Sequence, residues 1–168
     1  TTALAFPAEL GRALGSAVAN KLESAGEDLT AIRQDAISAP FVLLAGVFEP
    51  SELPDTPDWL TPVPDVTGTQ MGRAAAIAAH AFLGLETVSY GSENSGELFV
   101  SLTAIPGEGK FARTSQGGLR GHTDAVSFPF NGDIDASNAR IAPSPDLVTL
   151  VGLRNPNEVP TTVMVLDE

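Results

Sequence analysis

The chain has 168 residues, a formal net charge of -12 and no cysteine. Its length suggests one domain, and its hydrophobic content of 43% is typical of a folded protein rather than a disordered one. The acidic balance argues against binding to nucleic acid or to an anionic membrane, because both need clustered Lys and Arg. The lack of cysteine excludes disulfides, thiolate nucleophiles and Cys-ligated metals. No apolar run is long enough for a membrane span and no signal-peptide pattern opens the sequence, so we expect a cytoplasmic protein.

The first half of the sequence mainly predicts helices. Residues 7–25 begin with Pro7, which suits a first helical turn, and carry apolar residues at helical spacing, namely Leu10, Leu14, Val18 and Leu22. A second helix is expected over residues 28–38. A third, alanine-rich helix is expected over residues 69–83, with Thr69 as its cap and Gly84 at its end. Its alanines would permit close packing against a sheet.

Strand patterns dominate the second half. Residues 41–47 already form a compact apolar run that we expect to be a buried strand. The later strand candidates are residues 86–90, 97–104, 123–128, 147–153 and 162–166, separated by Gly- and Pro-rich turns. Helices followed by strands predict an α+β fold with an antiparallel sheet or a jelly roll. We expect one domain over residues 1–168, mainly helical over 1–84 and with the β core over 85–168.

His122 and Asp124 are the residues whose chemistry and spacing point to a metal ion. In a strand, residues two apart face the same side, roughly 6–7 Å apart. An imidazole and a carboxylate are two of the three ligands of the 2-His-1-carboxylate triad in non-heme Fe(II) oxygenases. The alternative is a surface strand on which the two side chains merely lie side by side. The other histidine, His80, is expected to be a packed or partly exposed helix residue, and Arg154 a structural ion-pair residue.

The segments around this pair occur in a recognisable order. They are N-S-G-E-L at 94–98, P-G at 106–107, L-R-G-H-T-D at 119–124, S-P-D at 144–146, L-R at 153–154 and P-T-T at 160–162. In this order and spacing, residues 85–168 resemble the clavaminate synthase-like branch of the Fe(II)/2-oxoglutarate-dependent dioxygenases.

The resemblance implies a double-stranded β-helix (jelly-roll) core under the N-terminal helices. It also implies Fe(II) as the metal, 2-oxoglutarate as cosubstrate, O2, and hydroxylation or desaturation of a small molecule. That substrate would be a free amino acid or an amino-acid-derived natural-product intermediate. Because halogenases of this kind replace the carboxylate ligand by a small residue, Asp124 favours hydroxylation or desaturation over halogenation.

The resemblance also assigns roles to individual residues. His122 and Asp124 match the iron ligands and therefore the catalytic centre. Thr161 matches the threonine that contacts 2-oxoglutarate in relatives, with Thr162 as the second choice. Two further residues, Ser115 and Gln116, fall where relatives contact the substrate.

One element of the family pattern is missing from this sequence. The family needs a second histidine ligand and an arginine far downstream, but no histidine follows His122. We therefore expect the 168 residues to be the N-terminal half of an oxygenase whose jelly roll is incomplete here. A missing C-terminal segment or a second chain would supply the distal His and Arg. The alternative is a non-catalytic, β-rich binding or assembly domain that keeps the fold without a complete iron site.

Overall fold

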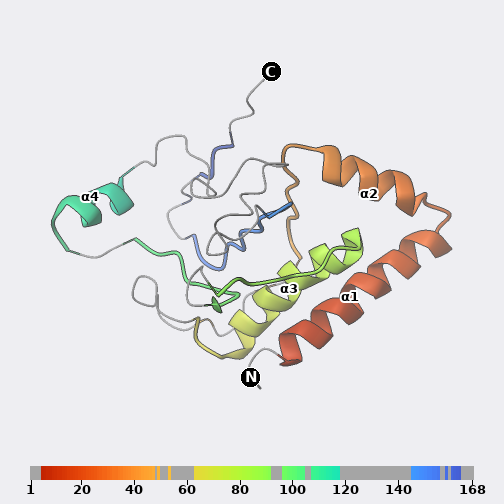
Figure 1. Ribbon diagram of the computed structural model, residues 1–168, viewed down its shortest axis with the longest axis horizontal. Helices are drawn as coiled ribbons and strands as arrows, with labels where there is room; N and C mark the ends of the chain where they lie inside the picture. The colour runs from red at the N-terminus through yellow and green to blue at the C-terminus, as the bar shows by residue number, and fades with distance from the viewer. Residues whose placement is uncertain are drawn as a thin grey trace, which may run out of the picture. The chain divides into compact units, whose positions relative to one another are not determined.

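The structure is a computed structural model that describes residues 5–47, 49, 53, 63–91, 96–104, 107–117, 145–155, 158 and 160–163. Within these residues the helices are α1 (Ala5–Ser24), α2 (Leu29–Ser38), α3 (Thr67–Leu83) and α4 (Lys110–Gln116), labelled in Figure 1. The chain divides into two compact units. The helices α1, α2 and α3 belong to the first, which we call the helical unit, and α4 belongs to the second. Whether residues 1–168 act as one domain stays a prediction.

The three helices expected in the first half are confirmed, and their ends follow from local chemistry. Asp28 precedes α2 and its side chain accepts hydrogen bonds from the backbone N–H groups of Thr30 at 2.9 Å and Ala31 at 3.1 Å. These bonds satisfy donors that the first turn of a helix leaves without an intrahelical partner. At the end of α3, Gly84 adopts a left-handed conformation with φ of 79°, which costs glycine little because it has no Cβ.

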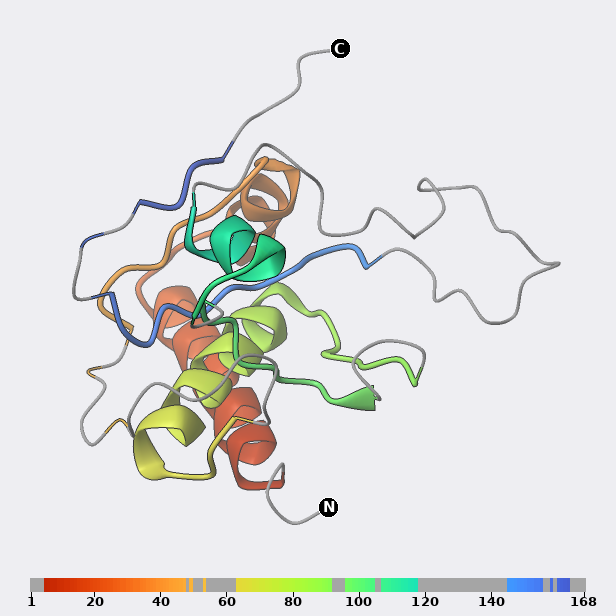
Figure 2. The ribbon, with the colours of Figure 1, turned by 90° about the vertical axis from the view of Figure 1, so that its left-hand side faces the viewer.

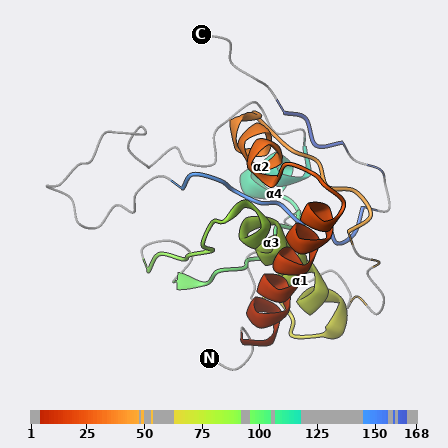
Figure 3. The ribbon, with the colours of Figure 1, turned by 90° about the vertical axis from the view of Figure 1, so that its right-hand side faces the viewer.

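The core of the helical unit lies between α1 and α3, which run side by side in the same direction in Figures 1, 2 and 3. The face of α1 that is buried is a stripe of small residues at four-residue spacing, Pro7, Gly11, Gly15 and Ala19. A Cβ added at Gly11 would lie 2.7 Å from the carbonyl oxygen of Ala74. One added at Gly15 would lie 2.7 Å from the carbonyl oxygen of Ala78. The two helices therefore approach so closely that only glycine fits at these two positions.

The apolar stripe that made α1 predictable from sequence is not its buried face. Leu14 is 38% exposed and Val18 is 48% exposed, although both occur at the expected helical spacing. The alanines of α3, for which we expected a sheet as partner, pack on a helix instead: Ala74 is completely buried, and Ile77 is 5% exposed. Close helix packing is governed by small residues that let the backbones approach, and Leu14 and Val18 are left exposed.

The predicted jelly-roll core is wrong for the part of the chain that the structure describes. Residues 86–90, 97–104 and 147–153 form neither strands nor a sheet, and Val100 alone makes an isolated bridge. Residues 41–47, expected to be a buried strand, form no strand either, and all of them are exposed. Strand-forming residues fit a pleated surface, but a strand exists only where a second backbone pairs with it, and sequence pattern does not supply that partner. Residues 123–128 lie outside the described ranges, as do residues 164–166.

The second unit contains the helix that the sequence did not predict. The helix α4 is seven residues long and begins after Gly109, which has φ of 122°. The N–H of Arg113 donates to the carbonyl oxygen of Gly109 at 3.0 Å, and Ala112 is 3% exposed. A helix of seven residues is too short to show a periodic apolar pattern. The sequence of this region therefore indicated only a turn, through the P-G pair at 106–107.

Candidate functional site

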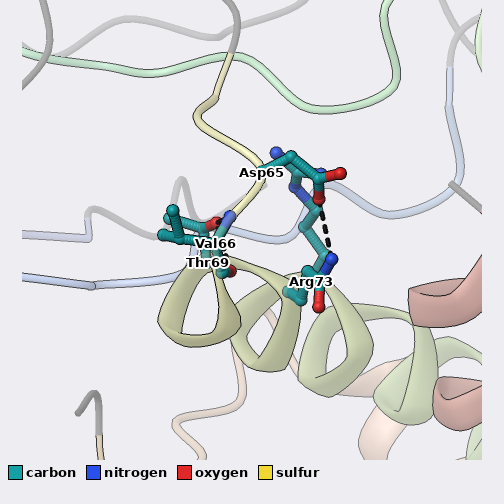
Figure 4. A network of polar contacts seen from close by, with 5 residues as sticks. Asp65, Val66, Thr69 and Arg73 are labelled. Carbon is teal, nitrogen blue, oxygen red and sulfur yellow. Dashed lines mark hydrogen bonds and ion pairs between the residues drawn. The ribbon is translucent and has the colours of Figure 1, made fainter. Parts of the chain in front are cut away.

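The best-defined polar cluster of the helical unit surrounds the start of α3 (Figure 4). The N–H of Val66 donates to the hydroxyl oxygen of Thr69 at 3.2 Å, and that hydroxyl donates to the carbonyl oxygen of Val66 at 2.9 Å. Thr69 is only 3% exposed. We expected Thr69 to be the cap that precedes the helix, but α3 begins at Thr67 with Val66 at the cap position, and Thr69 bonds to Val66 from inside the first turn. The reciprocal bonds fix the point at which the chain enters α3.

Asp65 and Arg73 complete this cluster. A guanidinium nitrogen of Arg73 lies 3.6 Å from a carboxylate oxygen of Asp65, and the same oxygen accepts a hydrogen bond from the Gln70 side-chain amide at 2.8 Å. Arg73 is 7% exposed, whereas the Asp65 side chain is 45% exposed. A buried guanidinium is costly without an opposite charge, and a carboxylate before the first turn also suits the positive end of the helix. The contacts therefore explain the cluster as a stabiliser of the α3 N-terminus.

No sequence pattern singles out Arg73 or Asp65. The two residues are eight positions apart, and Asp65 precedes the helix, so they do not form the (i, i+4) pair that a sequence pattern reveals. The usable signal was a lone arginine within an alanine-rich helical run, which suggests a charge held against a partner rather than in solvent.

His80 lies inside α3 and is partly buried, as expected for a packed helix residue. Its Nδ1 is 2.9 Å from the hydroxyl oxygen of Thr87, and its backbone carbonyl accepts a hydrogen bond from the N–H of Leu85 at 2.9 Å. Burial disfavours the charged imidazolium and so lowers the pKa of His80 from its ordinary value of 6.5. His80 thus holds the segment that follows α3, at Leu85 and Thr87, against the helix.

The two proposed iron ligands, His122 and Asp124, lie outside the described residues, so their mutual geometry stays a prediction. Thr161 and Thr162 are described and exposed, and neither belongs to a helix or strand. Whether either threonine contacts 2-oxoglutarate stays a prediction.

The predicted substrate residues Ser115 and Gln116 are consecutive residues at the end of α4. Gln116 is exposed, and its side-chain amide donates to the carbonyl oxygen of Gly107 at 3.3 Å, which joins α4 to the turn before it. Arg154 was expected to be a structural ion-pair residue, and its guanidinium donates a hydrogen bond to the backbone carbonyl oxygen of Leu53 at 3.2 Å. That bond links positions 101 residues apart within the helical unit.

The described residues contain neither a metal-ligand cluster nor a membrane-spanning helix. No three His, Asp or Glu side chains among them converge closely enough to hold a metal ion. None of the helices in the same ranges is long and apolar enough to cross a membrane.

Comparison with known proteins adds no relative from which a role could be transferred. No family model, curated protein or solved structure matches the chain.

Proposed function

We propose that this chain is part of a non-heme Fe(II)/2-oxoglutarate-dependent oxygenase that hydroxylates or desaturates a small molecule. The observation that supports the proposal is the H-T-D sequence at 122–124 within the ordered set of segments from 94 to 162. The substrate class that goes with it is a free amino acid or an amino-acid-derived natural-product intermediate, and the location is the cytoplasm. The jelly-roll fold is not part of the proposal, because the described residues contradict it.

The two predicted ligands, His122 and Asp124, have the chemistry that Fe(II) needs. A neutral imidazole from His122 and a carboxylate from Asp124 are ligands that suit Fe(II), and they would leave positions open for a bidentate cosubstrate and O2. Bound iron would supply the oxidising chemistry. The protein's own residues would hold the metal through His122 and Asp124 and orient 2-oxoglutarate through the hydroxyl of Thr161 or Thr162.

The third protein ligand is the part of the site that this sequence does not supply in the expected position. His80 is held on α3 against Thr87, within the helical unit. We therefore include in the proposal a His and an Arg from a further segment or a second chain. The same observation favours one alternative function, a non-catalytic binding or assembly domain that binds no iron.

One titration distinguishes these two functions. Fe(II) and 2-oxoglutarate are added to the chain under anaerobic conditions, and binding is followed by calorimetry and by the visible charge-transfer absorption of an Fe(II)–2-oxoglutarate chelate. The proposal predicts that H122A and D124A each weaken binding by about tenfold or more, since each removes one of only two protein ligands. The variant H80Q is the matched control because it removes the other histidine, and it should bind like the unmodified chain.

The result that would overturn the proposal is equally specific. If the unmodified chain, H122A and D124A bind Fe(II) with the same affinity, the H-T-D segment is not a metal site. The binding or assembly function is then favoured. A separate loss of 2-oxoglutarate binding in T161A or T162A, with Fe(II) binding retained, would show which threonine contacts the cosubstrate.

A further inference from the structure

We draw no further inference here: the strongest candidate, the exposed apolar surface segment at residues 41–47 after α2, carries nothing because nothing in the structure shows what covers it.

Discussion

The guanidinium of Arg33 on α2 makes two contacts with Phe82, which lies in the last turn of α3. Its Nε donates to the carbonyl oxygen of Phe82 at 2.6 Å, and its central carbon lies 5.6 Å from the centre of the Phe82 ring. The last four carbonyl groups of a helix lack intrahelical donors, and a cation there also complements the helix dipole. Arg33, which lies 49 positions before Phe82 in the sequence, therefore supplies a hydrogen-bond donor to one carbonyl group in the last turn of α3 and holds α2 against α3.

Replacing Arg33 should weaken the attachment of α2 to α3. We expect R33A to lower the free energy of unfolding by about 1–2 kcal/mol, because a part-buried hydrogen bond from a charged group and a cation–π contact are both lost. R33K should recover only part of this loss, since lysine keeps the charge but has no Nε–H at that position. Denaturant unfolding and amide hydrogen exchange across α2 measure the two effects.

The neighbouring exposed residue provides the control for Arg33. Gln34 lies on the same helix turn, and Q34A should leave both the unfolding midpoint and the exchange rates of α2 unchanged. Equal behaviour of R33A and Q34A would show that the Phe82 contact does not hold α2.

The close approach of α1 and α3 predicts that Gly11 does not tolerate a side chain. In an exposed helix, replacing glycine by alanine stabilises by about 1 kcal/mol because alanine has the higher helix propensity. At Gly11 the new methyl group would meet the Ala74 carbonyl oxygen and the Ile77 side chain, each at 2.7 Å. Overpacking costs about 1–3 kcal/mol, and a backbone oxygen in a helix yields little, so we expect G11A to destabilise the protein.

Thermal unfolding followed by helical circular dichroism measures this change. The control is G152A in the same unit, where an added Cβ would have no atom within 4 Å. Its effect should stay within about 0.5 kcal/mol of zero. A G11A protein as stable as, or more stable than, the unmodified chain would contradict the close contact between the two helices.

The lowered pKa of His80 predicts how the stability of the helical unit depends on pH. Between its lowered pKa in the folded state and about 6.5 in the unfolded chain, the unfolded state binds more protons, so stability rises with pH. The contribution of the neutral, partly buried imidazole is complete above about pH 6.5 and is lost as the pH falls through the lowered pKa. The cause is the cost of burying the charged ring.

The variant H80Q isolates this contribution because glutamine does not titrate. The difference in unfolding free energy between the unmodified chain and H80Q should be constant above about pH 7 and should shift against the unmodified chain as the pH falls toward about 5. Carboxylates titrate in both proteins, so they largely cancel in the difference. A difference that does not vary with pH would show that burial of His80 does not perturb its titration.

The sequence predicted the existence of helices better than it predicted their contacts. The ends of α2 and α3 follow from Asp28 and Gly84, whose effects are local and so are visible in the sequence. The buried face of α1 was not visible, because Gly11 and Gly15 carry no hydrophobic signal and become buried only when α3 lies against them. A periodic apolar stripe shows that a helix forms, but the side that is covered depends on the partner.

The same limit explains the error in the second half of the chain. The apolar pattern at residues 97–104 fits a strand locally, yet the described backbone there pairs only through an isolated bridge at Val100. The chemistry of His122 and Asp124 can be inferred from residue type alone, because imidazole and carboxylate are metal ligands in any fold. Their spatial relationship depends on long-range pairing, which a single sequence does not specify.

An open ligand position at the predicted iron site should respond to free imidazole. If His122 and Asp124 supply two ligands and the third is a histidine from elsewhere, then imidazole can occupy that third position. We expect added imidazole to strengthen binding of Co(II), used as an air-stable probe whose visible spectrum reports its ligands. The effect should appear for the unmodified chain and for H80Q, because His80 is held against Thr87 on α3.

The variant D124A determines whether this response comes from the site. It lacks the carboxylate ligand, which imidazole cannot replace, so imidazole should not restore in it the Co(II) spectrum of the unmodified chain, whereas D124E should respond because glutamate is also a carboxylate ligand. If D124A responds to imidazole as strongly as the unmodified chain, the metal is bound elsewhere. The predicted ligand pair would then be wrong, whatever its sequence context.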